Sequence, residues 1–115
     1  MQYLLLIYGN EANMLSAGKD TMQQIVAAYG AYTEAIRTSG VLVGSNRLRP
    51  TSTATTVSVT NGESKVLDGP YAETKEQLGG HYLIDVPDVD AALTWAARCP
   101  GAAHGRIEVR PIWSI

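Results

Sequence analysis

The chain has 115 residues and a mass of 12.3 kDa, which is the size of one domain with a hydrophobic core of its own. Nine basic and eleven acidic side chains give a net charge of −2, and a single cysteine, Cys99, is present. This composition argues against a strongly basic nucleic-acid binder, an intrachain disulfide and a cysteine-rich metal site. We therefore expect one domain spanning residues 1–115, with no direct nucleic-acid ligand, no metal and no cofactor.

The first apolar run covers residues 3–8 and ends at Gly9, a pattern typical of a short central strand. The run follows no basic segment and precedes no small-residue cleavage site, so it does not resemble a signal peptide. It is also much too short to cross a membrane. We expect a cytoplasmic protein that does not bind membranes.

A helix is predicted next, because apolar side chains recur at helical spacing over residues 22–36. Thr21 and Gln24 have the spacing of a capping box, in which each side chain satisfies a free backbone amide at the start of the helix. Asp20 is a rival N-cap whose charge suits the helix dipole. Gly40 is expected to end the helix in a left-handed conformation.

The rest of the chain is predicted to form a β-hairpin followed by a strand–helix–strand unit. Asn61 and Gly62 predict a tight hairpin turn, because both residues tolerate positive φ, and Asp88 is the expected N-cap of the second helix. The expected strands cover residues 41–43, 55–60, 63–67, 81–86 and 106–110, and the second helix ends at residues 100–101. This order predicts an α+β fold of the ferredoxin-like βαββαβ type with an inserted β-hairpin, an antiparallel sheet and two helices on one face.

The densest polar stretch of the chain runs from Asp68 to Gly80, and His81 follows it directly. Carboxylates, a phenol and an imidazole in proximity can transfer protons. The candidate catalytic residues are therefore Asp68, His81 and Tyr71. The candidate ligand-binding residues are Glu73, Lys75, Glu76 and Arg47, with Lys75 or Arg47 holding an anionic substrate. The alternative is structural, since residues 69–70 are typical of a turn and residues 73–77 of a solvated helical turn.

Residues 68–80, DGPYAETKEQLGG, together with YLIDVPD at 82–88, resemble the signature of the YCII-related proteins of the DGPF type. The start, YLLLIY at 3–8, and the tail, GRIEVRPI at 105–112, are similar to that family as well. The resemblance implies a bacterial, cytoplasmic protein of the dimeric α+β barrel superfamily, in which two protomers pack their sheets face to face. The low charge content agrees with a homodimer, because an interface needs fewer charges than a solvated surface.

The resemblance does not carry a mechanism to this chain. Relatives proposed to be enzymes use a histidine of the first helix paired with an aspartate, whereas this chain has Ala28, Tyr29, Gly30 and Tyr32 in that helix and no histidine. The first hypothesis is a small-molecule-binding protein or small enzyme of proton transfer, such as elimination or isomerisation. Its polar pocket would surround residues 68–80 at the sheet and dimer interface.

The second hypothesis is a non-catalytic dimeric module with a regulatory or accessory role. DGPF-type proteins are often encoded beside, or fused to, extracytoplasmic-function sigma factors, so the resemblance implies a sigma factor as a possible partner. The polar stretch at 68–80 would then be structural. Asp68 would cap a turn, and Glu73, Lys75 and Glu76 would form ion pairs across an interface.

Overall fold

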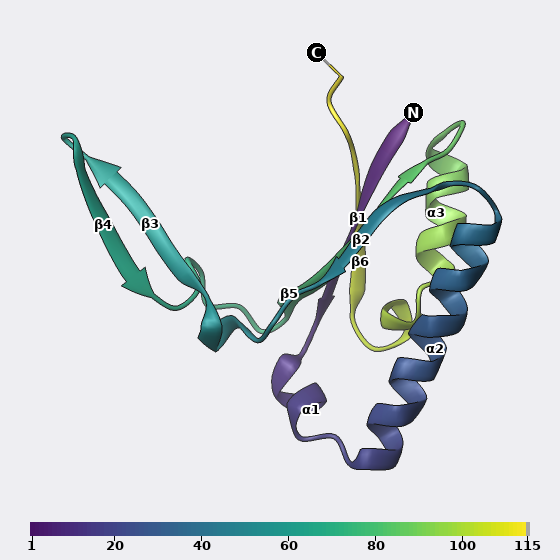
Figure 1. Cartoon of the computed structure of the whole chain (residues 1–115), viewed down its shortest axis with the longest axis horizontal. Helices are drawn as coiled ribbons and strands as arrows, with labels where there is room; N and C mark the ends of the chain where they lie inside the picture. The colour runs from purple at the N-terminus through teal and green to yellow at the C-terminus, as the bar shows by residue number, and fades with distance from the viewer. Residues whose placement is uncertain (115) are drawn as a thin grey trace.

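The computed structural model describes residues 1–114 and has an α+β architecture (Figure 1). The strands are β1 (Gln2–Gly9), β2 (Leu42–Arg47), β3 (Thr55–Thr60), β4 (Glu63–Asp68), β5 (Gln77–Asp85) and β6 (Arg106–Pro111). The helices are α1 (Glu11–Leu15), α2 (Lys19–Thr38) and α3 (Val89–Arg98), with short 3-10 turns at Thr51–Thr53 and Pro100–Ala103. The predicted fold class is confirmed, since β3 and β4 form a hairpin inserted into a βαββαβ chain.

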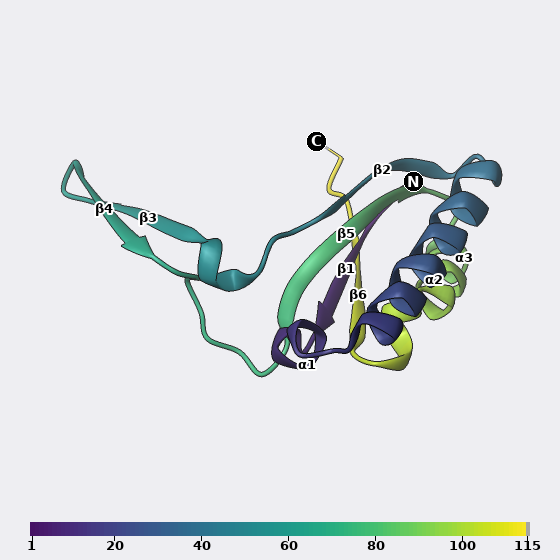
Figure 2. The same cartoon turned by 60° about the horizontal axis from the view of Figure 1, so that its bottom comes forward.

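The main sheet is antiparallel and has the strand order β2-β5-β1-β6. Helices α2 and α3 cover one face of it, and the other face is open (Figure 1, Figure 2). Because successive side chains of a strand point to opposite faces, β1 buries Tyr3 and Leu5 under the helices. Leu4 and Leu6 therefore lie on the open face, where Leu83 of β5 is the partner of Leu4.

The core lies between the sheet and the second half of α2. Leu5, Ile36 and Ile84 are completely buried there. The ring of Tyr32 stands edge-on to that of Tyr82, with centroids 5.2 Å apart, and its hydroxyl donates a hydrogen bond to the carbonyl of Trp95 over 2.8 Å. A tyrosine suits this position because its ring packs in the core while its hydroxyl finds a backbone partner.

The inserted hairpin, which we call the arm (residues 55–68), extends away from the sheet. In both views it leaves the sheet on the side opposite α2 and α3 (Figure 1, Figure 2). Its turn is the predicted one, with φ of 52° at Asn61 and 79° at Gly62. The predicted helix ends are confirmed as well, since Gly40 has φ of 82° and the Asp88 carboxylate accepts a hydrogen bond from the Ala91 amide over 2.9 Å.

The start of α2 corrects the sequence-based prediction. The helix begins at Lys19 with Gly18 as its N-cap and without a side-chain capping bond, so the Thr21–Gln24 capping box and the Asp20 N-cap are wrong. Both motifs lie inside the first turns because the chain becomes helical earlier than expected. The preceding segment contains a further short helix, α1, whose start is capped by the side chain of Asn10.

Two strands differ most from their predicted lengths. β2 continues to Arg47, and β5 starts at Gln77, four residues before the expected beginning. Gly79 and Gly80 thus belong to β5, which pairs with β1 as far as Gly9. Among the described residues, 1–114, no helix is long and apolar enough to cross a membrane.

Candidate functional site

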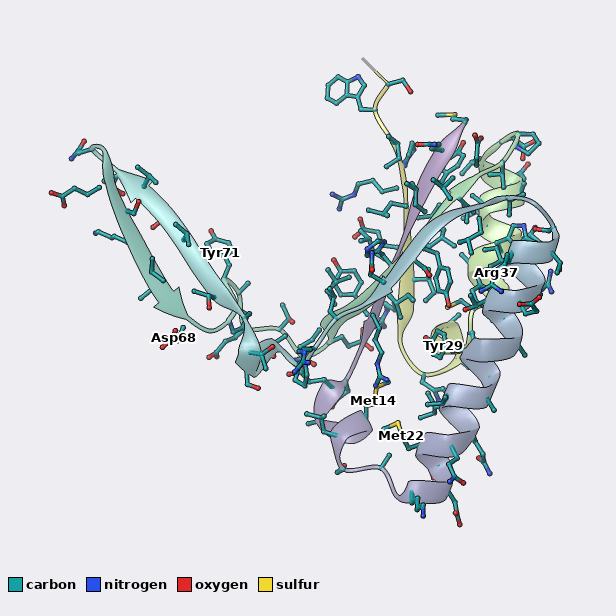
Figure 3. The ribbon with its side chains drawn as sticks, viewed as in Figure 1. Met14, Met22, Tyr29, Arg37, Asp68 and Tyr71 are labelled. Carbon is teal, nitrogen blue, oxygen red and sulfur yellow. The ribbon has the colours of Figure 1, made fainter. Side chains whose placement is uncertain are left out.

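The predicted catalytic residues Asp68 and Tyr71 lie on the arm side of the molecule. Asp68 ends β4, and Tyr71 follows it in the segment that returns to the sheet. Figure 3 shows both of them away from the helices, and the side chain of Tyr71 is 92% exposed. Within one chain these two groups therefore lie outside the packed body of the domain.

The returning segment is irregular and does not form the helical turn considered for residues 73–77. An ion pair links it to the sheet: the Glu76 carboxylate accepts a hydrogen bond from the exposed Arg106 guanidinium over 2.7 Å. Glu73 and Lys75 are exposed and form no ion pair within residues 1–114. The contact of Glu76 is thus structural within a single chain.

His81 lies in the middle of the sheet, on the open face. It alternates along β5 with Gly80 and Tyr82, which belong to the helix-covered face, and it is the strand partner of Asn46. Its Nε2 lies 3.4 Å from the Asn46 amide nitrogen, whereas its Nδ1 is buried without a hydrogen-bond partner among the described residues. The structure does not bring Asp68 or Tyr71 into hydrogen-bond contact with this imidazole.

A pocket of about 410 Å³ lies on the other face, between α1, the first half of α2 and the sheet edge formed by β2 and β5. Figure 3 shows Met14 and Met22 approaching each other from α1 and α2, with Tyr29 further along α2. The apolar wall is formed by Ile7, Met14, Leu15, Met22, Ile25, Val26 and Leu48. The polar residues of the lining are Glu11, Tyr29, Ser45, Asn46, Arg47, Arg49, His81 and Tyr82, of which Asn46 and His81 direct their side chains to the open face.

The pocket exists because the apolar stripe of α2 is longer than the surface that covers it. Tyr32 and Ile36, in the second half of the helix, are buried against the sheet. In the first half, Met22 and Ile25 are only half-buried, and Val26 is 55% exposed. The sequence identified these residues as one apolar face, but helical periodicity does not show whether a face is covered by protein or by a ligand.

Tyr29 supplies a neutral phenol to the pocket. Its hydroxyl oxygen lies 3.9 Å from the Cys99 sulfur, and Gly101 leaves room for it, because a Cβ there would lie 2.6 Å from that oxygen. Burial raises the pKa of Tyr29 well above its ordinary value, and burial also raises the pKa of the Cys99 thiol. At neutral pH the phenol is therefore a hydrogen-bond donor, and the thiol is not an activated nucleophile.

Positive charge gathers at the sheet side of the pocket. Arg47 and Arg49 both line it, and neither forms an ion pair with any residue of the described chain. The acidic residue of the lining, Glu11, accepts hydrogen bonds from the backbone amide of Thr51, over 3.1 Å, and from the Thr51 hydroxyl. Arg47 was predicted as a ligand-binding residue, and Arg49 is a further cation beside it. An arginine that lacks a carboxylate partner can bind an anionic group of a ligand.

The comparisons with known proteins identify the family. The YCII-related domain family matches residues 1–115, so this chain belongs to the YCII-related family. An uncharacterised protein of Rhizobium meliloti (strain 1021) is 38% identical over 114 residues, covering 97% of this chain and 92% of that protein.

A solved structure shares the fold. The 5-chloro-2-hydroxyhydroquinone dehydrochlorinase of Burkholderia phenoliruptrix AC1100, in complex with 2,5-dihydroxybenzoquinone, superposes with a TM-score of 0.56 and 13% identity. The superposition covers 99% of this chain and 94% of that one. At this identity the likeness shows the fold alone.

Proposed function

We propose that this protein is a small-molecule-binding protein or a small enzyme, whose ligand is a compact organic anion with an apolar body. The observation that carries the proposal is the pocket between α1, α2 and the sheet. Its volume of about 410 Å³ lies within the range of small-molecule sites, which combine an apolar lining with a few polar groups. The apolar wall would hold the body of the ligand, and Arg47 with Arg49 its anionic group.

The chemistry of the proposed ligand agrees with that of the structural neighbour, which was solved with 2,5-dihydroxybenzoquinone. A compact ring with polar oxygens fits a pocket that offers apolar side chains, the phenol of Tyr29 and a guanidinium. This agreement supports the use of 2,5-dihydroxybenzoquinone as a first probe.

For an enzyme of this kind we propose proton transfer, such as elimination or isomerisation. The candidates for the proton-transfer step remain Asp68, Tyr71 and His81, with Glu73, Lys75 and Glu76 as ligand contacts. These residues lie on the arm side or on the open face, and of the six only His81 borders the pocket. A role for Asp68 and Tyr71 thus depends on a homodimer, which we also propose, in which a second copy meets the open face and the arm. The alternative, a non-catalytic dimeric regulatory or accessory module linked to an extracytoplasmic-function sigma factor, stays a prediction.

The pocket proposal is tested by filling the pocket. Isothermal titration of the wild-type protein with 2,5-dihydroxybenzoquinone and with 4-phenylbutyrate is expected to show binding of at least one probe. Met22→Trp would place an indole ring in the cavity and occupy the space of the ligand. It is therefore expected to weaken that binding by at least about tenfold. The matched control is Val89→Trp, at an exposed position of α3 outside the pocket lining.

Two results would contradict the proposal. One is binding to Met22→Trp with the affinity of the wild type, which would place the ligand elsewhere. The other is the absence of binding to the wild type across both probes and a wider set of small organic acids and phenols.

A further inference from the structure

The two faces of the arm differ in chemistry. In the hairpin register Val57 lies opposite Val66, and Val59 lies beside them on the same face opposite Ser64. These three valines, which we call the valine face, are 61%, 62% and 64% exposed. The other face carries the opposed pairs Ser58–Lys65 and Thr60–Glu63 and, near the base of the arm, the opposed pair Thr56 and Leu67, of which Leu67 is exposed. The outer part of the arm, from residue 57 to residue 66, is thus amphipathic, although its own chain covers neither face.

The arm is supported mainly by itself. Its extensive contacts within the described chain are those between β3 and β4. Its base is closed by the Gly69 amide, which donates to the Ala54 carbonyl over 2.7 Å, and by the Thr56 hydroxyl, which donates to the Gly69 carbonyl over 2.8 Å. A lone two-stranded hairpin is marginally stable in water, so a valine face of this kind needs a partner.

The size of the uncovered surface suits a dimer. The chain exposes 8130 Å², whereas a compact monomer of this mass exposes roughly 6,100 Å². Its radius of gyration is 16.1 Å, against about 13 Å for a compact domain of this length. The excess area of about 2,000 Å² per chain exceeds the roughly 800 Å² per partner of a standard stable interface.

The direction of the arm indicates the occupant. The arm projects on the side of the open sheet face, which carries Leu4, Leu6 and Leu83 (Figure 1, Figure 2). A second copy packed on that face would meet the arm, and its own arm would meet the first copy by the same two-fold symmetry. The valines themselves carry no charge that would select a strongly basic or acidic partner.

We infer that the arm is a dimerisation arm, which packs its valine face against a second copy of this chain. The inference rests on the proposed homodimer and adds to it an interaction surface outside the main sheet. Because Leu48, Arg49 and Pro50 connect the arm to β2 and also line the pocket, docking of the arm would hold one wall of the pocket in place. Binding of the second copy is thus coupled to the ligand site through residues 48–50.

The test compares two matched double variants of the full chain by sedimentation equilibrium. V57E/V66K replaces the valine face with an opposed charge pair that can still form across the hairpin, and S58E/T60K places opposite charges beside Lys65 and Glu63 on the polar face. The wild type is expected to dimerise, V57E/V66K to raise the dimer dissociation constant by about 100-fold or more, and S58E/T60K to change it by less than about threefold. Thermal melts followed by circular dichroism check that the body of each variant is folded.

Hydrogen exchange of the wild type provides a second readout. The amides of β3 and β4 are expected to be protected in the dimer and to lose that protection on dilution to the monomer. A V57E/V66K variant that dimerises as tightly as the wild type would overturn the arm inference and leave the homodimer intact. A wild type that is monomeric at all concentrations would overturn both and leave the ligand pocket untouched. Equal weakening by both double variants would also contradict the role of the valine face.

Discussion

At the residue scale, Gly101 shows how a missing side chain positions a functional group. A Cβ at this position would lie 2.6 Å from the Tyr29 hydroxyl oxygen and 3.0 Å from Cγ2 of Ile7. Both atoms belong to residues that line the pocket. Because Tyr29 and Ile7 pack this closely against Gly101, the Tyr29 phenol is half-buried and is held beside the Cys99 thiol.

We therefore expect Gly101→Ala to lower the free energy of unfolding by about 1–3 kcal/mol, measured by urea denaturation, because overpacking displaces the neighbouring side chains. In a Tyr29→Phe background the loss should be smaller, since the closest atom is gone. The control is Gly30→Ala, at an exposed position of α2 where a Cβ meets nothing within 4 Å. That variant should be neutral or more stable by up to about 1 kcal/mol. Equal losses in the two alanine variants would contradict this account of Gly101.

Burial of the Cys99 thiol predicts a pH dependence of stability. Burial raises the pKa of Cys99 in the folded chain, so the unfolded chain releases this proton first, at about pH 8.5. The contribution of the neutral thiol to the free energy of unfolding is thus fully present below about pH 8. It is lost as the pH rises from the pKa of the unfolded chain to the higher pKa of the folded chain. Burial raises the pKa of Tyr29 as well, which extends the loss to more alkaline pH.

Urea denaturation at several pH values between about 7 and 10 checks this expectation, with Cys99→Ala as the comparison. The wild type should lose stability over this range, and the variant should lose less between about pH 8 and 9.5. A variant with the same slope as the wild type would show that the thiol is not the titrating group.

At the scale of elements, the short helix α1 is held in place by hydrogen bonds from its first residue, Glu11, to two other segments of the chain. The Glu11 carboxylate accepts hydrogen bonds from the Thr51 amide and hydroxyl at the root of the arm, and the Glu11 amide donates to the Gln77 side chain over 3.0 Å. These bonds connect the start of α1 to the segments before β3 and at the start of β5. Since α1 contributes Met14 and Leu15 to the pocket, the same bonds fix one of its walls.

Glu11→Ala is expected to lower the free energy of unfolding by about 1–3 kcal/mol, because it leaves two donors of Thr51 without their acceptor. It should also weaken binding of any pocket ligand, as measured by isothermal titration. Glu34→Ala is the matched control, because the ion pair of Glu34 with Arg37 is exposed and is worth at most about 1 kcal/mol. Similar losses of stability in both variants would contradict the role assigned to Glu11.

The elements also show what the sequence could predict. Turn and cap chemistry at Asn61, Gly62, Gly40 and Asp88 was sufficient to place the hairpin and two helix ends, because each depends on local backbone geometry. The capping box at Thr21 failed for the opposite reason, since a longer helix overrode a local motif. The apolar stripe of α2 was predicted, but its separation into a packed half and a pocket half depends on the sheet beneath it.

The candidate site was predictable only in part for the same physical reason. Arg47 was predicted to hold an anionic group because of its type and position, and the structure places it in the lining of the pocket. Met22, Ile25 and Tyr29 lie on the apolar face predicted for the first helix, but nothing in a helical period distinguishes core from ligand pocket. The polar stretch that contains Asp68 was chosen for its density of functional groups, yet a single chain holds that residue at the base of the arm, outside the pocket.

At the scale of the whole molecule, the low charge content of 17% has two structural correlates. One is the open sheet face, where half-buried leucines of β1 and β5 lie, and the other is the exposed valine face of the arm. Both are surfaces that a second copy would cover, and both border the elements that line the pocket. The proposed dimer and the proposed ligand site therefore depend on the same part of the chain.

The central claim is that the pocket binds an organic anion through Arg47. The most direct measurement is isothermal titration of the wild type and Arg47→Gln with 4-phenylbutyrate and with its neutral amide. We predict that the wild type prefers the carboxylate by at least about tenfold and that Arg47→Gln loses most of this preference while it still binds the amide. Equal affinity of the wild type for the two compounds, or an unchanged preference in Arg47→Gln, would contradict the claim.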